Sequence, residues 1–169
     1  METWDAITSR RNVRAYADQP VSQEHLDRIL EAGRRTPSSR NIQPWDFVLV
    51  TDRAQLQALA TVWVGAAHVA TSAAMIALVI HADPEQGKRA QFDLGQATMS
   101  IMLAAADLGV GSCHAGVGDQ EKAGRLLRLP PDRVCSFLIS LGYPADRPLS
   151  PIAKPDRKPF DEIVHYSTW

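Results

Sequence analysis

Residues 73–81 read Ala-Ala-Met-Ile-Ala-Leu-Val-Ile-His, and every side chain before the histidine is apolar. A helix that crosses a bilayer needs roughly 20 apolar residues, so this segment is too short to span a membrane. A short, uninterrupted apolar run is typical of a strand with both faces covered by other elements. The segment therefore predicts a strand that is buried on both faces.

The segments around this strand alternate between helical and extended patterns. Ser22 precedes a run with acidic residues early and arginines late, which predicts a capped helix that ends near Arg35. Further helices are predicted for residues 3–11, 53–63, 92–108 and 119–127. Further strands are predicted for residues 45–50, 112–117 and 134–141. This alternation of elements places the chain in the α/β or α+β class.

Length and composition predict one globular domain over residues 1–169. The chain has 169 residues, of which 45% are hydrophobic and 22% charged. Five prolines after residue 142 predict that residues 143–169 form an extension that crosses a surface, its own or a partner's.

Charge and cysteine content exclude several classes of protein. The formal net charge of −1 gives no field that would attract nucleic acid or an anionic membrane. The first eleven residues mix acidic and basic side chains where a signal peptide would be apolar, so we expect a cytoplasmic protein. Cys113 and Cys135 lack metal-ligand spacing, and we expect both to be reduced core residues with no metal site.

The first candidate binding motif is SRRNVR at residues 9–14. If the N-terminal helix persisted to Arg14, then Arg10 and Arg14 would project from one face. A phosphate between them would relieve their repulsion, because guanidinium forks match phosphate oxygens. Alone, the motif indicates a solvated helix end with ordinary surface ion pairs more readily than a phosphate site.

Three other segments carry candidate chemistry. Residues 37–45, PSSRNIQPW, place short hydrogen-bonding side chains between two prolines, and could bind a polyhydroxyl chain or simply connect a helix to a strand. Residues 109–118, GVGSCHAGVG, fail the dinucleotide fingerprint, yet their glycines would let a flat ligand approach backbone amides. Residues 154–159, KPDRKP, form a basic cluster or a solvated charge run.

Taken in order, these motifs resemble the nitroreductase family of FMN-dependent oxidoreductases. The resemblance rests on SRRxxR, PSSxNxQPW, a DLG at residues 93–95 opening an alanine-rich helix, LGxGSC and the final RKP, and it spans essentially the whole chain. It implies an α+β fold with a central mixed sheet flanked by helices. It also implies a homodimer with two FMN sites at the interface, and a C-terminal tail that wraps the partner subunit.

The resemblance implies a set of cofactor-binding residues from one chain. Arg10 and Arg157 would clamp the FMN phosphate, and Arg14 would lie near the N1/O2 edge of the flavin. Arg11 and Asn12 would be neighbours of the phosphate or of the flavin.

The same resemblance divides the rest of the site between two chains. The backbone amides of Ala115 and Gly116 would face the flavin N5. The other subunit would supply Pro37, Ser38, Ser39 and Asn41.

The activity implied is ping-pong hydride transfer from NADH or NADPH through FMN N5 to a small acceptor such as a nitroaromatic or a quinone. The flavin would carry the chemistry, so no catalytic side chain is expected. The alternatives are an FMN store or sensor with little turnover, and a flavin enzyme with one dedicated substrate, such as an oxidase or a dehalogenase.

Two departures from the family pattern bear on the site. Few residues lie between Asp83 and Gln91, where longer relatives carry a covering segment, so we expect an open pocket. No lysine lies between Val62 and Ser72, where some relatives place an extra cation, so Arg14 would act alone beside the flavin.

Overall fold

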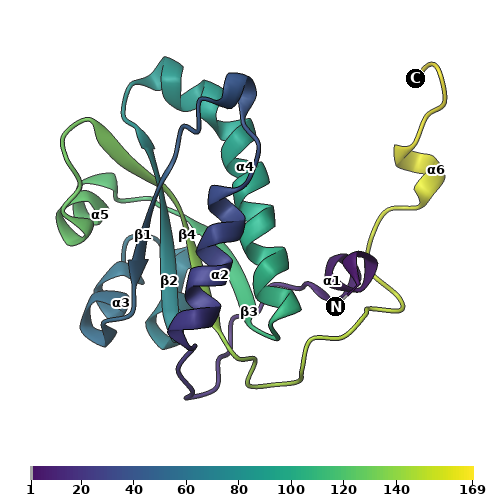
Figure 1. Ribbon diagram of the computed structural model, residues 1–169, viewed down its shortest axis with the longest axis horizontal. Helices are drawn as coiled ribbons and strands as arrows, with labels where there is room; N and C mark the ends of the chain where they lie inside the picture. Colours follow the sequence, from purple (N-terminus) through teal and green to yellow (C-terminus); the bar gives the residue numbers. More distant parts are fainter. Residues whose placement is uncertain (1) are drawn as a thin grey trace.

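A four-stranded sheet organises the computed structural model, which describes residues 2–169; Met1 lies outside them (Figure 1). The strands are β1 (Asp46–Val50), β2 (Ala74–His81), β3 (Gly111–Gly116) and β4 (Arg133–Gly142), in the spatial order β1-β2-β4-β3. Residues 74–81 of the apolar run form β2, which pairs with a strand on each side and is buried from Ala74 to Ile80. The prediction of a strand buried on both faces is confirmed.

The α+β class is confirmed, with a qualification about the sheet. All three strand pairs are antiparallel. Within residues 2–169 the parallel component of the predicted mixed sheet is the isolated bridge between Asn12 and Ser112. The sheet is thus antiparallel except where the N-terminal segment joins its edge.

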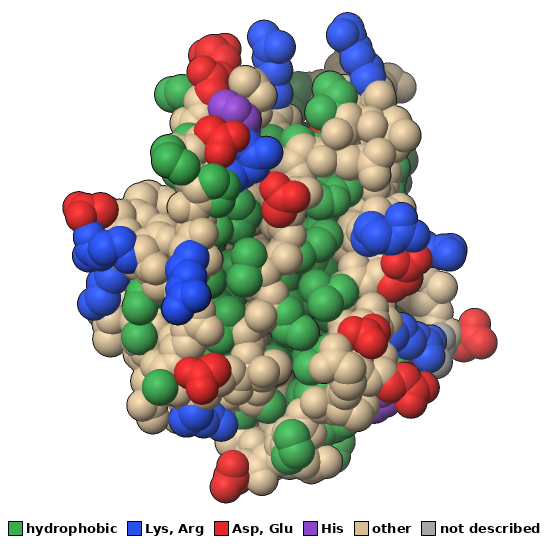
Figure 2. All heavy atoms as spheres, turned by 60° about the vertical axis from the view of Figure 1, so that its left-hand side comes forward, with side chains coloured by type: hydrophobic (Ala, Val, Ile, Leu, Met, Phe, Trp, Pro, Cys, Tyr) green, Lys and Arg blue, Asp and Glu red, His purple; other side chains and the backbone are tan. Residues whose placement is uncertain are grey.

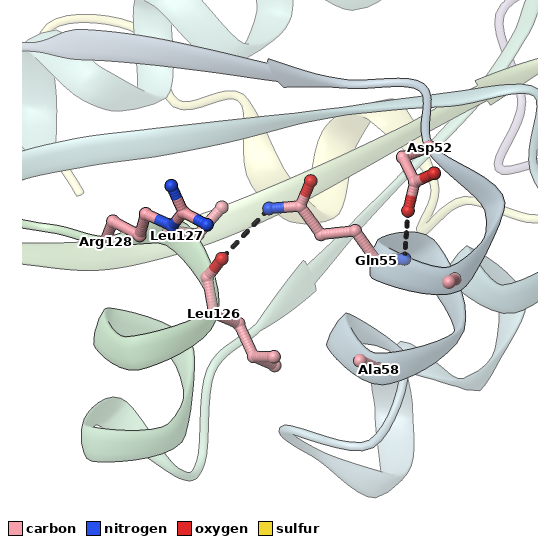
Figure 3. Close-up of a pocket in the computed structure, with 7 residues that line it drawn as sticks. Asp52, Gln55, Ala58, Leu126, Leu127 and Arg128 are labelled. Carbon is pink, nitrogen blue, oxygen red and sulfur yellow. Dashed lines mark hydrogen bonds between the residues drawn. The ribbon is translucent and has the colours of Figure 1, made fainter.

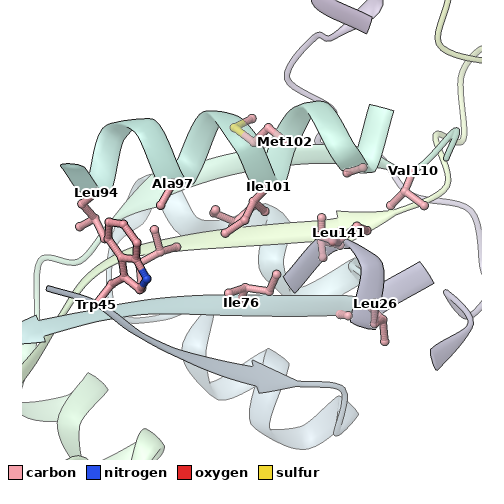
Figure 4. Packing of buried hydrophobic residues seen from close by; sticks show 14 of the residues in the cluster. Leu26, Trp45, Ile76, Leu94, Ala97, Ile101, Met102, Val110 and Leu141 are labelled. Atoms are coloured by element: carbon pink, nitrogen blue, oxygen red, sulfur yellow. The ribbon is translucent and has the colours of Figure 1, made fainter. Parts of the chain in front are cut away.

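Helices cover both faces of the sheet and create two apolar layers. One face carries α2 (Gln23–Arg34) and α4 (Pro84–Asp107), packed on alternate β2 residues such as Ile76 (Figure 4). The other face carries α3 (Arg53–Leu59), the 3-10 helix η2 (Val64–Thr71) and α5 (Gln120–Leu127), packed on the intervening residues such as Ala77. The two-residue period of a strand explains why β2 supplies both layers.

The helix α1 (Thr3–Ser9) ends before the arginine motif, so the expectation that Arg10 and Arg14 share a helical face is wrong. Arg10 has an extended backbone, with ψ 124°. Two residues later the chain pairs with β3, where the Val13 amide donates to the Ser112 carbonyl at 3.0 Å. Strand pairing therefore overrides the local helical preference.

Two other helices have bounds that differ from the sequence prediction. α3 ends at Leu59, because the Val62 carbonyl accepts hydrogen bonds from the amides of Gly118 and Asp119 and cannot continue a helix. α4 begins at Pro84, eight residues before the predicted start, where Asp83 caps the Gln86 amide. The DLG motif lies inside α4 and does not open it.

The sequence prediction missed three short helical segments. They are η1 (Ser39–Asn41) in the polar loop, η2 on the sheet, and α6 (Phe160–Ile163) in the tail. None of the described helices is long and apolar enough to span a membrane. Cys113 and Cys135 are free and fully buried, as predicted.

The C-terminal tail runs alongside the N-terminal segment and then leaves the sheet. The Ala17 amide donates to Tyr143, the Ala145 amide to Ala15, and the Ile152 amide to Thr8. Beyond this stretch the tail extends away from the sheet, past α1, to the C-terminus (Figure 1). Its larger apolar side chains are exposed: Phe160, Ile163, Tyr166 and Trp169.

The close approach of the N-terminal segment to β3 depends on Gly111. A Cβ atom at this position would lie 2.7 Å from the Val13 side chain, which is buried. We predict that Gly111→Ala lowers the free energy of unfolding by about 1–3 kcal/mol, because the overpacked Val13 must move. Chemical denaturation at one fixed protein concentration measures the change.

Gly124→Ala is the matched control, because a Cβ there meets nothing within 4 Å and the residue lies inside α5. Removing a helical glycine should stabilise the protein by about 0.5–1 kcal/mol. Equal effects of the two substitutions would contradict the steric account of Gly111.

Candidate functional site

The arginine motif forms an extended segment along the edge of the sheet. In extended backbone alternate side chains share a side, which places Arg10, Asn12 and Arg14 together and opposite the buried Val13. The Arg10 Nη1 donates to the Asn12 Oδ1 at 3.1 Å, in agreement with this alternation. The arginines thus share a face after all, through strand geometry and not through a helix.

Arg11 points the other way and anchors the tail. Its Nη2 donates to Asp146 Oδ1 at 2.7 Å and to the Arg147 carbonyl at 2.9 Å. The hydrogen bond from Arg11 lowers the pKa of Asp146 below its ordinary value. Arg157 lies further along the exposed tail, and its described hydrogen bond is to the Asp156 carbonyl.

A buried polar network, which sequence reasoning missed, connects this segment to η2 and β4. The Nδ1 of His68 lies 2.8 Å from the Ser140 Oγ, which lies 2.6 Å from the Tyr16 hydroxyl. That hydroxyl donates to the Val13 carbonyl at 2.6 Å. The network fixes the backbone on which Arg14 is carried. His68, a polar side chain within the otherwise apolar or glycine residues 64–70, was the available signal.

Burial sets the protonation states around this network. Burial lowers the pKa of His68, and electrostatic interaction with Arg14 lowers it further. Burial raises the pKa of Tyr16 and that of the Cys113 thiol. At neutral pH the imidazole, the phenol and the thiol are therefore uncharged, and Arg14 remains the cation beside them.

Three buried polar atoms lack a hydrogen-bond partner within residues 2–169: two belong to the arginine motif and the third to the network of His68, Ser140 and Tyr16. They are Ser9 Oγ, Arg11 Nε and His68 Nε2. An unsatisfied buried polar atom costs about 1–3 kcal/mol, so native structures rarely leave several in one region without a function. Their grouping indicates a place where a polar ligand completes the hydrogen bonding.

Strand β3 offers backbone groups next to this region. It is the last strand in the sheet order, and its outer edge is bridged to the N-terminal segment at Ser112. Ala115 and Gly116 follow beyond this bridge. The Trp63 ring lies near Gly116, where an added Cβ would sit 3.6 Å from it. A flat ligand could approach the backbone here because glycine has no side chain.

The polar loop lies at the opposite end of the protomer. It follows the C-terminal end of α2 and contacts α4, where the Ser39 amide donates to Asp93 Oδ2 at 3.1 Å. Figure 1 shows this loop at the top, well separated from the N-terminal segment beside α1. One protomer therefore does not bring Pro37, Ser38, Ser39 and Asn41 to the arginine motif.

The loop has an unusual backbone. Arg40, Asn41 and Gln43 have φ values of 52°, 56° and 52°, in the left-handed region. The Gln43 amide donates to Ser38 Oγ at 2.8 Å, which closes the turn. Non-glycine residues in this region store strain and concentrate at ligand sites. Trp45, at the end of the loop, is buried in the core.

Two hollows open on the surface. A cavity of about 1030 Å³ adjoins the polar loop and the first turns of α4. A smaller one, of about 550 Å³, lies between α3 and α5, where the Gln55 side chain donates to the Leu126 carbonyl (Figure 3). The smaller hollow is lined by none of the predicted site residues.

Charge is dispersed on the face that Figure 2 shows. Lysine and arginine side chains there alternate with acidic ones around an apolar band, and they form no continuous basic surface. His114 is exposed on β3. Among residues 2–169 no three His, Cys, Asp or Glu side chains are grouped to hold a metal ion.

Comparison with known proteins gives one consistent result. A sequence model of the nitroreductase family matches residues 7–74 and 60–143. A protein of Archaeoglobus fulgidus, provisionally named an NADH dehydrogenase/NAD(P)H nitroreductase, is 36% identical over 148 residues, 83% of this chain and 84% of the relative. The oxygen-insensitive NADPH nitroreductase of Salmonella typhimurium is 32% identical over 178 residues, 96% of this chain and 72% of the relative.

A solved structure extends the similarity to the fold. The structure of an FMN-dependent nitroreductase from Clostridium difficile R20291 superposes with a TM-score of 0.86 at 25% identity. The match covers 97% of this chain and 98% of that chain. The similarity therefore includes both the N-terminal segment and most of the tail.

The lowered pKa of His68 predicts an acid-sensitive fold. In the unfolded chain His68 titrates near its ordinary pKa of about 6.5, so the unfolded state takes up a proton before the folded state does. Stability should fall as the pH drops from about 7 to 5, and His68→Gln should weaken this dependence. Urea denaturation at several pH values measures it.

His165→Gln serves as control, because His165 is exposed on the tail and should leave the slope as in the wild type. A His68→Gln slope equal to that of the wild type would show that the histidine does not titrate as described.

Proposed function

The chain belongs to the nitroreductase family, and on that premise we propose that it is an NAD(P)H-dependent FMN oxidoreductase. In the proposed cycle NADH or NADPH reduces the bound flavin and leaves before a small acceptor, such as a nitroaromatic or a quinone, enters. The observation that carries the proposal is the grouping of arginines and unpartnered buried polar atoms at residues 9–14.

The residues at this segment suit a flavin mononucleotide. Arg10 and Asn12 are already hydrogen-bonded to each other on one side of the segment, where a phosphate could accept from the guanidinium. Within the same segment Ser9 Oγ and Arg11 Nε are buried without partners, Arg11 on the side opposite Arg10. The tail passes Thr8 at Ile152, which supports a role for Arg157 as the second cation of the phosphate clamp.

The protein groups then tune and orient the cofactor, which supplies hydride acceptance and donation when bound. Arg14 would stabilise the negative charge that reduction places at the N1/O2 edge. The network of Tyr16, Ser140 and His68 holds the backbone that carries Arg14. Backbone amides at Ala115 and Gly116 would orient N5.

The overall reaction balances without an acid or base from the protein. With FMN bound, each turnover would take one hydride from NAD(P)H and deliver one hydride and one solvent proton to the acceptor. A nitro group would be reduced to a nitroso group, with the release of one water molecule. This balance agrees with the absence of a predicted catalytic side chain.

Each site is proposed to draw on two subunits of a homodimer. The polar loop and the arginine motif lie at opposite ends of one protomer, so a second chain must supply Pro37, Ser38, Ser39 and Asn41 (Figure 1). Met99 is exposed on α4, and the tail carries exposed Phe160 and Trp169. Such apolar surface on a monomer indicates an interface.

Complementation between two defective chains tests this arrangement. One variant carries Arg10→Ala with Arg157→Ala, and the other carries Asn41→Gly, which keeps the left-handed backbone at φ 56°. Each alone should bind FMN about tenfold or more weakly, because charge-assisted or polar contacts are lost. Co-expressed, they should form heterodimers with one intact and one doubly defective site.

The measurement is an FMN titration of purified heterodimers, with Arg128→Ala as a control for removing an exposed arginine. We expect one tight FMN per two chains. If every site in the heterodimer stays weak, each site lies within a single chain, and the two-subunit proposal fails.

A further inference from the structure

The larger hollow lies beside the polar loop, away from the arginine motif of its own chain. Its volume of about 1030 Å³ is that of a small-molecule site. The polar loop, the start of β1 and the first turns of α4 form its walls. Side chains of the lining include Arg40, Trp45, Arg89, Phe92, Asp93 and Arg133.

Some charged side chains that line this cleft have no oppositely charged partner. Arg133 is paired with Asp46 at 3.3 Å and with Asp132 at 2.6 Å. Arg40 and Arg89 have no carboxylate partner in the part of the chain that the structure describes.

Asp93 is the carboxylate of the lining that is not paired with Arg133. Asp93 accepts hydrogen bonds from the Ser39 amide at 3.1 Å and from the Gln96 side chain at 3.4 Å. Two guanidiniums therefore face one carboxylate, and the cleft carries one excess positive charge.

Apolar surface accompanies these arginines. Phe92 is 78% exposed and Ile42 is 65% exposed, and both line the cleft together with the buried Trp45. A cleft that combines an aromatic wall with guanidinium forks fits a flat ring bearing a carboxylate, because the fork matches both oxygens. A neutral ring would gain the apolar contact alone.

The start of α4 keeps the cleft open. The helix begins at Pro84, three residues after β2 ends at His81, so no covering segment intervenes between them. Arg89 and Phe92 lie one helical turn apart and both line the cleft. The first turns of α4 thus form one wall of the cleft at its entrance.

We propose that this cleft receives the acceptor, and that Arg40 and Arg89 select aromatic acceptors that carry a carboxylate. The inference rests on the proposed function, in which the neighbouring Ser39 and Asn41 lie against the flavin of the partner subunit. A molecule seated beside them then faces that flavin. Arg40 and Arg89 are specificity-determining residues in this scheme and take no part in hydride transfer.

The test compares a charged and an uncharged acceptor of the same shape in the FMN-loaded dimer. The probes are 4-nitrobenzoate and 4-nitrobenzamide, and the readout is the ratio of their kcat/KM values in wild type, Arg40→Ala, Arg89→Ala and the double variant. We expect wild type to favour the benzoate and each single variant to lower the ratio about fivefold to tenfold, since each removes a charge-assisted contact.

Arg128→Ala is a close match for Arg40→Ala. Both arginines are exposed, and their φ values are 53° and 52°, so the two substitutions place alanine in the same backbone conformation. Arg128 lines the other hollow, between α3 and α5 (Figure 3). The control should keep the wild-type ratio.

A binding measurement without turnover accompanies the kinetics. Benzoate and benzamide, which cannot be reduced at a nitro group, are titrated into the oxidised FMN-loaded dimer while the flavin spectrum is followed. Benzoate should bind more tightly than benzamide, its affinity should fall with added salt, and the double variant should lose the preference.

Each other outcome overturns the inference in a recognisable way. A wild-type ratio near one, or a ratio that survives the double substitution, excludes selection by these arginines. Slower flavin reduction by NADH or NADPH with an unchanged acceptor ratio assigns them to the phosphates of the donor. A dimer that binds no FMN overturns the proposed function itself, and the inference with it.

Discussion

The pairing of the N-terminal segment with the edge of β3 is the constraint on which the site depends. The Val13 amide donates to the Ser112 carbonyl, and the absence of a side chain at Gly111 lets the two backbones approach. This contact ends α1 at Ser9 and imposes a two-residue period on the arginines. The same segment then supports the tail, which follows it from Ala17 back to Thr8.

The polar groups around this segment form two sets. Tyr16, Ser140 and His68 hydrogen-bond to one another and to the Val13 carbonyl and so rigidify the backbone, although His68 Nε2 has no partner among residues 2–169. Ser9 and Arg11 retain unpaired buried atoms at its surface. We infer that the first set supports a cofactor site and that the unpaired atoms of the second set would hydrogen-bond to the cofactor.

Local signals in the sequence were sufficient for elements that are stabilised locally or by simple burial. The apolar run of β2 and the Ser22 cap of α2, which accepts from the His25 amide, were predicted correctly. Long-range contacts decided the rest. α1 is ended by β3, and no local pattern joins His68 to Ser140, 72 residues away. The start of α4 had a local signal, Asp83-Pro84, that the prediction overlooked.

The candidate site shows the same division. The candidate residues were predicted from the types and order of residues in the motifs, because arginines and short polar side chains suit the recognition of a phosphate and a flavin. Their separation within one protomer was not readable from any motif, since it depends on how α2 carries the polar loop to the far end of the sheet (Figure 1). The cationic cleft also escaped notice, because Arg40 and Arg89 come from segments that only the tertiary fold brings together.

The most direct test of the account is the visible spectrum of the FMN-reconstituted protein before and after anaerobic addition of NADH or NADPH. The account predicts a yellow protein whose flavin band bleaches with at least one donor and returns when a nitroaromatic or a quinone is added. A protein that binds FMN but stays yellow with both donors would be a flavin store or sensor, and one that binds no FMN would contradict the assignment of the arginine motif.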